Sequence, residues 1–487
     1  MLLPLLPPAA TSPHPATRIR LLFSAVVIGV LATALLQAGD APGPAPAPTP
    51  ILPGEVTVTP NPTAPYTPPK GTLTLTQALD LGDNLNETRE VARARLEEAL
   101  ATRKQALALL LPTLAASSQL EQYVVGDSPV GGQHKLYGNA NNLGVNLTLT
   151  LFNATSIDQL RSQTASVSAQ MLDSNELRRG LAYQITGGFL LVIAAEHQVI
   201  AAVRARDVAA QTLDQTRARF KVGVATSNDV TRSQLTLATS ELTLTQDRQA
   251  VVSARFSLGD LVGRDVVESL VEPDPALVPS RELPAMEQFG LEERPDLASS
   301  VLRIRATELQ SEAAGATILP TVGVRGSWLL QSQFPTLAYP NSPEWQVALV
   351  ASWTLYDGGN REATVDLYDS ERRETVANLN LAKRQLHRDI ATGLSSLRTA
   401  EISLEQSTTA LRVARLNEEE TLTRFKQGLA TALDAADASA QSFQADSDLT
   451  GRQLDLASSR FSLRQLIGRW PLTDTVPTPL VQPVPAH

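Results

Sequence analysis

Four segments of the chain alternate apolar and polar residues with a period of two, the pattern of β-strands that have one apolar and one polar face. They are 113–124, 143–152, 321–331 and 345–356. In 143–152 (LGVNLTLTLF), valine and leucine occupy one face, while Asn146, Thr148 and Thr150 occupy the other. Alanine and serine blur the faces of the first segment. Because a tilted strand needs about 9–11 residues to cross a bilayer, the pattern predicts membrane strands.

Aromatic residues in or beside these strands are candidates for a membrane girdle, since aromatic rings collect at both interfaces of transmembrane barrels. They are Tyr123, Phe152, Trp328, Trp345, Trp353 and Tyr356. The alternative is a water-soluble sheet packed on a helix, which shows the same alternation. In lipid, open sheet edges are not tolerated, so four strands would need further copies of the chain. Two copies would give eight strands around a filled interior, and three would give twelve around an aqueous bore.

An internal repeat with a spacing near 205 residues organises the rest of the chain. The matched pairs are LLLPTL at 109–114 and TILPTV at 317–322, TLTLFNA at 148–154 and SWTLYDG at 352–358, RFKVGVATSNDV at 219–230 and RFKQGLATALDA at 424–435, and RFSLGDLVGR at 255–264 and RFSLRQLIGR at 460–469. Their common order predicts one structural unit used twice, with a period far longer than that of solenoid repeats.

Each repeat is predicted to contain three helical stretches around its strand pair. The expected helices are 73–111, 155–221 and 227–263 in the first repeat, and about 291–318, 360–426 and 432–468 in the second. Proline disfavours helix in the residue before it, so Pro112 and Pro320 end the opening helices. The strand loops are expected at 126–142 and 333–344. At 1.5 Å per residue, each long helix would reach roughly 100 Å.

The two ends of the chain have the composition of targeting and linker segments. Arg18 and Arg20 precede an apolar run and a small-residue end, as in a secretory signal peptide, although an uncleaved N-terminal anchor is the alternative. Proline-rich composition predicts stiff, extended segments on both sides of the folded part. The expected organisation is a signal peptide at 1–38, a linker at 39–70, the first repeat at 71–265, a connector at 266–290, the second repeat at 291–469 and a tail at 470–487.

The composition and motifs of the chain argue against most kinds of catalytic and binding site. The formal charge of −9 argues against nucleic acid as a partner. With no cysteine there is no disulfide, thiolate metal site, cysteine nucleophile or lipidated cysteine. None of the five histidines stands at metal-ligand spacing, and no P-loop, dinucleotide fingerprint or nucleophile elbow is present. We therefore expect no enzyme activity, no cofactor and no metal. The aromatic content of 4% favours long helices packed through small side chains.

One pair of carboxylates is a candidate site. Asp434 and Asp437 stand three residues apart at the start of a predicted helix, which places them on one face. The first repeat has Asp229 at the equivalent of Asp434, but Arg232 at the equivalent of Asp437. The simpler interpretation is that negative charge stabilises the helix N-terminus.

With these features, residues 71–469 resemble the TolC family of outer-membrane efflux proteins. The resemblance is carried by 72–114, by the two strand-to-helix junctions (TLTLF and SWTLY), by the two RF-x-x-G turns and by the two RFSL segments. It implies a membrane α+β fold: a homotrimer in which each chain gives four strands to a 12-stranded β-barrel and long helices to a periplasmic α-helical barrel, built from two tandem repeats. The implied location is the outer membrane of a Gram-negative-type bacterium, in contact with outer-membrane lipid and extending into the periplasm.

By the same resemblance, the turns at the ends of the long helices form periplasmic tips that meet a periplasmic adaptor (membrane fusion) protein, coupled to an inner-membrane pump of the RND, ABC or MFS type. The tip residues are Val222, Gly223, Val224, Ala225 and Thr226 in one turn, and Gln427, Gly428, Leu429, Ala430 and Thr431 in the other. Asp434 and Asp437 match aspartates that ring the tip aperture in some members. Asp229 matches one residue of the set of contacts, the lock, that holds this aperture closed. Two other lock positions differ, because Ala430 replaces an arginine and Phe425 a tyrosine.

The function implied is a passive exit duct for a tripartite efflux pump or a type I secretion system. The alternative is a periplasmic coiled-coil scaffold without a pore.

Overall fold

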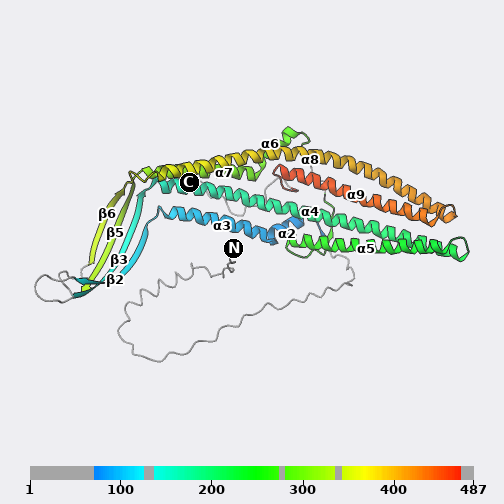
Figure 1. The fold of residues 1–487 in the computed structure, drawn as a ribbon, viewed down its shortest axis with the longest axis horizontal. Helices are drawn as coiled ribbons and strands as arrows, with labels where there is room; N and C mark the ends of the chain where they lie inside the picture. The colour runs from blue at the N-terminus through cyan, green and yellow to red at the C-terminus, as the bar shows by residue number, and fades with distance from the viewer. Residues whose placement is uncertain (1–70, 126–135, 274–279, 335–342, 473–487) are drawn as a thin grey trace, which may run out of the picture. The chain divides into compact units, whose positions relative to one another are not determined.

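The computed structural model describes residues 71–125, 136–273, 280–334 and 343–472, and Figure 1 shows their arrangement. The predicted signal peptide and linker, and nearly all of the tail, lie outside these residues. The first repeat contains β1 (Thr72–Leu73), α2 (Leu75–Leu85), α3 (Glu87–Ala108), β2 (Thr113–Val125), β3 (Leu136–Phe152), α4 (Ala154–Lys221) and α5 (Ser227–Val262). The remainder contains β4 (Ser269–Leu270), α6 (Leu283–Glu293), α7 (Pro295–Gly315), η1 (Ala316–Ile318), β5 (Thr321–Phe334), β6 (Pro343–Ser352), α8 (Asn360–Gln427) and α9 (Ala432–Leu466).

The long and closing helices agree with the prediction to within a few residues, whereas the opening helices do not. The first predicted opening helix, 73–111, is broken in two at Asn86, between α2 and α3. The second, about 291–318, corresponds mainly to α7, and it is preceded by α6, which lies mostly in the predicted connector and is separated from α7 by Arg294. Arg294 is extended (ψ 118°) because it precedes Pro295. Asn86 is also extended, and its side chain caps α3 by accepting a hydrogen bond from the Thr88 amide.

The strand boundaries correct the predicted loops. Residues 136–142 belong to β3 and not to a loop, because β2 pairs with β3 along the whole length of β2, from Val125 opposite Leu136 to Thr113 opposite Thr148. Likewise 333–334 belong to β5 and 343–344 to β6. Residues 353–356, predicted as strand, lie beyond the end of β6; there the Trp353 indole donates to the Ile318 carbonyl at 2.8 Å.

Strands and helices follow the same lateral order. The sheet is antiparallel throughout, in the order β2-β3-β5-β6, so β2 and β6 are its edges. The helices that lead into or out of these strands, α3, α4, α7 and α8, contact one another in that order. Further from the sheet, α5 takes the place beside α4 and α9 lies beside α8 and α4, as Figure 1 shows. The helical layer therefore has the same two edges as the sheet, α3 with α5 and α8.

The core lies where the ends of the closing helices meet the middle of the long helices. In the first repeat Phe189, Ile185 and Val192 of α4 pack with Leu258 of α5. In the second, Leu386 and Ile390 of α8 pack with Leu463 of α9.

Glycine permits this close packing in both repeats, 205 residues apart. A Cβ at Gly188 would lie 3.3 Å from Leu261, and one at Gly393 would lie 2.8 Å from Leu463. Helix α4 also contains an 18-residue window that is apolar enough to cross a membrane by length and composition. Of that window, 39% is buried in the chain.

Candidate functional site

The register of the sheet brings the apolar positions of all four strands onto one face. On β6 and β5, Trp345 stands opposite Trp328 and Leu349 opposite Val324. The row continues through Leu149 of β3, opposite Val324. Parallel rows join Val347, Gly326, Leu147 and Leu114 across the four strands. On this face Trp345, Val347 and Leu349 are exposed, so the surface is apolar and unpartnered within the chain.

The opposite face is polar. Gln346 pairs with Ser327, Ser327 with Asn146, and Arg325 with Thr148. Since neighbouring residues on one strand point to opposite sides, these residues and the apolar rows lie on different faces. The sheet separates an apolar surface from a polar one, as the alternation predicted.

The six predicted girdle residues lie at three levels along the strands. Trp328 and Trp345 form a tilted ring pair with centroids 6.3 Å apart, at the eighth residue of β5 and the third residue of β6. Phe152, Trp353 and Tyr356 lie at the junction between strands and helices, all exposed. Tyr123 lies in β2, paired with Gly138.

At the other end of α4 and α8, two short turns lead into α5 and α9. Both turn at a glycine in the left-handed region, Gly223 (φ 77°) and Gly428 (φ 84°). The Val224 amide donates to the Arg219 carbonyl at 2.9 Å and the Leu429 amide to the Arg424 carbonyl at 2.8 Å, which satisfies helix-end carbonyls. Val222, Val224 and Leu429 project unburied from these turns. The ten predicted tip residues thus form two hairpin ends with apolar surface.

Asp229 and Asp434 close matching capping boxes just after these turns. The Asp434 carboxylate accepts from the Thr431 amide (2.8 Å) and hydroxyl (2.7 Å), and Asp229 accepts from Thr226 at 2.9 and 2.8 Å. Hydrogen bonds from Thr431 lower the pKa of Asp434, and those from Thr226 lower the pKa of Asp229. In the described chain both aspartates therefore serve as helix caps, the simpler of the two interpretations above.

This cap makes the second tip acid-sensitive. The pKa of Asp434 is lower in the folded chain than in the unfolded chain, where an aspartate has a pKa of about 3.9. The stabilisation that the ionised carboxylate gives to the folded tip is therefore complete at pH values above the unfolded pKa. It is lost as pH falls through the lowered folded pKa. We expect Asp434→Asn to speed hydrogen–deuterium exchange at residues 431–434 at neutral pH. We also expect it to reduce the loss of protection, measured against the intrinsic exchange rate at each pH, that the native tip shows below about pH 4.

Asp437→Asn is the matched control, since Asp437 lies one turn further along α9 and outside the capping box. Equal exchange in the two variants at neutral pH would contradict the assignment.

Asp437 and Arg232, which occupy equivalent positions in the two repeats, are brought to one place. Both line an open groove of about 450 Å³ between the two hairpins. The rest of the lining is mostly small residues of α4, α5 and α9, such as Ala205 and Ala436, with the Phe443 ring beside them. The structure thus separates Asp437, in a groove, from Asp434, in a cap.

The two hairpins are joined by a contact that sequence reasoning missed. The Arg219 guanidinium of α4 lies 4.2 Å from the centre of the Phe425 ring of α8, a cation–π distance. Phe425 is buried with Ala432 and Ala435, and Ala430 packs against this cluster. The sequence repeat gave no signal for this contact, because Phe220, the equivalent of Phe425 in the same motif, is exposed.

Comparison with known proteins identifies the family to which the chain belongs. A family model described as "Outer membrane efflux protein" matches residues 86–264 and 289–469, more than half of the chain and both repeats. The chain belongs to the outer membrane efflux protein family. Relatives agree: the outer membrane efflux protein BepC of Brucella suis is 22% identical over 346 residues, covering 68% of this chain and 73% of BepC. Outer membrane protein OprJ of Pseudomonas aeruginosa is 24% identical over 388 residues, covering 75% and 77%.

Solved structures share the fold. The outer membrane protein VceC of Vibrio cholerae matches with a TM-score of 0.68 and 19% identity, over 82% of this chain and 96% of that one. CusC matches with a TM-score of 0.71 and 14% identity, over 81% and 92%. The protein is thus an outer membrane efflux protein, located in the outer membrane.

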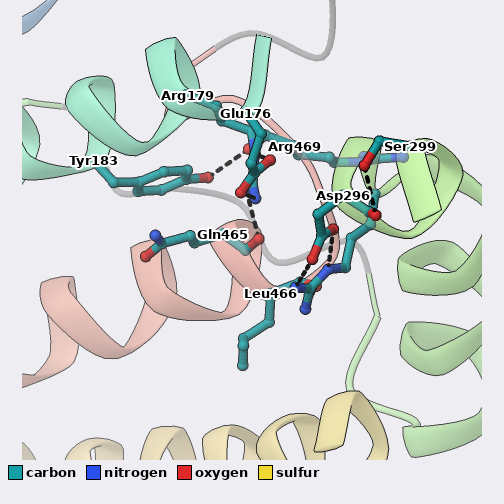
Figure 2. A network of polar contacts seen from close by, with 9 residues as sticks. Glu176, Arg179, Tyr183, Asp296, Ser299, Gln465, Leu466 and Arg469 are labelled. Carbon is teal, nitrogen blue, oxygen red and sulfur yellow. Dashed lines mark hydrogen bonds and ion pairs between the residues drawn. The ribbon is translucent and has the colours of Figure 1, made fainter. Parts of the chain in front are cut away.

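A buried polar network holds the middle of this outer-membrane efflux protein together (Figure 2). Arg179 of α4, 3% exposed, donates to both Glu176 oxygens (2.6 and 2.8 Å) and to the Gln465 carbonyl of α9 (2.6 Å). The Tyr183 hydroxyl donates to the Arg469 carbonyl at 2.8 Å. Burial raises the pKa of Tyr183 far above its ordinary value, so this hydroxyl keeps its proton.

The network continues to the break between α6 and α7. Arg294 donates to both oxygens of Asp296 (2.6 and 2.9 Å). Arg469 donates to Glu293, the last residue of α6. Figure 2 shows these side chains converging from α4, α7 and the end of α9, so the network joins the first repeat to the second. Among the described residues, no group of three or more histidines and carboxylates could hold a metal ion.

Proposed function

We propose that this efflux channel works as a homotrimeric, passive exit duct of a tripartite pump or type I secretion system. Three chains would contribute twelve strands to a β-barrel in the outer membrane and their long helices to a periplasmic tunnel. Each chain would contribute two similar portions of the duct wall, one from each tandem repeat. The repeats are 71–265 and 291–469, joined by the connector at 266–290. The signal peptide at 1–38 would direct export, with the 39–70 linker and the 470–487 tail as extended ends.

One observation carries this proposal: the register that puts apolar residues of four strands on one face and polar residues on the other. A closed barrel would present the first face to lipid and the second to an aqueous bore. The girdle fits this orientation. Trp345 lies seven residues before the end of β6, which at about 3.3 Å per residue is roughly 23 Å along the strand. At a strand tilt of about 35–45° this is roughly 16–19 Å along the membrane normal, and Trp353 and Tyr356 lie beyond that end, so the tryptophan pair and the aromatic residues at the junction are separated by a distance comparable to an apolar band about 25 Å tall.

The unpaired edges of the sheet support closure by further copies of the chain. β2 and β6 each present unused backbone hydrogen-bonding groups, which a lipid environment does not tolerate. With twelve strands the bore is wide enough for water, whereas eight strands would be filled by their own side chains.

The hairpin ends would be the docking points for a periplasmic adaptor. Their ten residues include exposed valines and a leucine on rigid turns, the kind of surface that packs against another helical hairpin. The adaptor would connect the duct to an energised inner-membrane pump, because the sequence contains no nucleotide-binding motif of its own. A scaffold without a pore has no support, since the family consists of channels.

We further propose that Asp434, Asp437 and Asp229 of three copies surround a narrow periplasmic aperture and favour cations. Capping does not prevent this, because the Asp434 carboxylate remains fully exposed while one of its oxygens accepts both bonds from Thr431. The contact of Arg219 with the Phe425 ring would help to hold the aperture closed, in place of the lock contacts that an arginine at position 430 and a tyrosine at position 425 would make.

Planar-bilayer recordings test the proposal. We expect the purified protein to conduct ions without nucleotide and to prefer cations, and we expect Asp434→Asn with Asp437→Asn to reduce that preference and to weaken block by multivalent cations. Arg93→Gln, a change far from the tips on α3, is the control. Failure of the native protein to conduct would overturn the duct. Conductance with unchanged selectivity in the double variant would overturn only the aperture ring.

A further inference from the structure

Arg325 is the single basic residue on the polar face of the described strands β2, β3, β5 and β6. Thr148 of β3 stands opposite it on one side and Ala348 of β6 on the other. Arg325 is exposed, and within the described part of the chain its side chain has no hydrogen-bond or ion-pair partner. No neighbouring carboxylate therefore balances the charge of its guanidinium.

The carboxylates of the same face lie further along the sheet. Glu344 of β6 belongs to a row four residues beyond Arg325, and Glu121 of β2 to a row eight residues beyond it. At about 3.3 Å per residue, these rows are roughly 13 and 26 Å away along the strands. Arg325 itself is four residues from Thr321, where β5 begins. Among the described strand residues, the part of the polar face nearest the helices thus carries one positive charge and no negative charge.

The residues around Arg325 leave the guanidinium uncovered and add neutral hydrogen-bond donors. Gly323 and Ser327 precede and follow it on the same face of β5, because side chains two residues apart point to the same side. Gly323 and Ala348 are too small to shield it, whereas Ser327 and Thr148 carry hydroxyl groups. A guanidinium presents five donors in a planar fork that matches two oxygens of a carboxylate or phosphate. This part of the polar face therefore has the donors of an anion-binding surface and lacks competing carboxylates.

We propose that Arg325 binds carboxylate- or phosphate-bearing anions inside the bore, at the end of the barrel nearest the periplasm. This rests on the homotrimeric duct proposed above, in which the polar face of the sheet lines the bore. Three copies then place three guanidiniums at one level of the wall. Low-dielectric walls lined by one sign of charge focus the electric field and raise the local concentration of counter-ions. The cargo that this ring assists is anionic, with at least one carboxylate or phosphate group.

The ring of Arg325 and the aspartates proposed at the aperture have opposite charges and lie at opposite ends of the duct. Helix α8, which runs between the two levels, has 68 residues and is about 100 Å long at 1.5 Å per residue. This length is about ten Debye lengths at 0.1 M salt, so the two rings act on ions independently. The aspartates set the preference of the narrow aperture for cations, whereas Arg325 binds anions in the wider barrel.

Fluorescence quenching tests the site without requiring conduction. The native chain has no cysteine, so a dye on Thr148→Cys reports the anion concentration beside Arg325. In the full-length protein at 10 mM salt, adding Arg325→Gln should lower iodide quenching about twofold relative to quenching by neutral acrylamide, the effect of a unit charge about 8 Å away in water. At 1 M salt the Debye length is about 3 Å, and the difference should disappear.

Two controls separate the site from general effects. Arg325→Lys keeps the charge and should keep the quenching ratio at Thr148→Cys. A dye on Gln331→Cys, on the same face six residues or about 20 Å further along β5, should hardly respond to Arg325→Gln. An equal response at the two dye positions, or no response at Thr148→Cys, would overturn the anion site.

Planar-bilayer recordings test whether the site acts on ions in the bore. Inorganic pyrophosphate, added on the barrel side, should block the native current, and Arg325→Gln should weaken this block about tenfold. Arg325→Lys should weaken it less, because lysine keeps the charge but loses the planar fork. The Asp434→Asn, Asp437→Asn variant should be blocked as the native protein is. An unchanged block in Arg325→Gln would refute the placement of the site in the bore.

The two measurements keep this inference apart from the duct. A protein that conducts, with block and quenching both unchanged by Arg325→Gln, refutes only the anion site. A protein that does not conduct, but whose iodide quenching depends on Arg325, refutes only the duct.

Discussion

Replacing Arg179 with leucine should lower the free energy of unfolding by about 3 kcal/mol, the lower end of the range of about 3–5 kcal/mol for breaking a buried ion pair. Arg179 satisfies both oxygens of Glu176 and the Gln465 carbonyl, and leucine would leave all three without this donor. The lower end applies because the Glu176 side chain is 29% exposed and can recover part of its hydration. Urea unfolding in detergent, followed by circular dichroism, measures the loss.

The matched control is Arg93→Leu on α3. Arg93 pairs with Glu97 at 2.9 Å, but both side chains are more than half exposed. Such a surface pair contributes about 0.3–0.5 kcal/mol, so its loss should hardly move the urea midpoint. Equal midpoints for the two variants would show that the network does not hold the repeats together.

The long elements of this fold could be predicted from sequence because local signals repeat. Period-two alternation marked the strands, and the RF-x-x-G turns, present twice, marked the ends of both long helices. The breaks at Asn86 and Arg294 were missed, since neither residue interrupts the apolar pattern. The position of Pro295, immediately after Arg294, was the available signal.

The candidate site was predictable only where a side chain acts locally. Asp229 and Asp434 act within three residues of their partners, so capping could be read from the sequence. Arg179 and Gln465 are 286 residues apart, and Arg219 meets Phe425 across two hairpins. No spacing rule indicates such contacts. Phe256 is exposed and Phe461 is buried, although they occupy the same position of the two RFSL segments, so their burial could not be predicted from the repeat.

Gly468→Ala should destabilise the protein by about 2–5 kcal/mol, because two costs add. Gly468 has φ 87°, and the left-handed region costs other residues about 1–2 kcal/mol. A Cβ there would also lie 2.8 Å from the carbonyl carbon and oxygen of Glu293, and overpacking costs about 1–3 kcal/mol. Backbone atoms cannot rotate away as a flexible side chain can, so relief requires the end of α6 to move.

Gly428→Ala separates the two costs. Gly428 has almost the same backbone conformation, φ 84°, but an added Cβ would meet nothing within 4 Å. Only the conformational cost of about 1–2 kcal/mol remains, and it should be confined to the tip, where exchange at 427–431 detects it. Urea midpoints should therefore fall further for Gly468→Ala than for Gly428→Ala. Equal losses would mean that the joint between α9 and α6 yields to the methyl group, and that the meeting point of the two repeats is not rigidly packed.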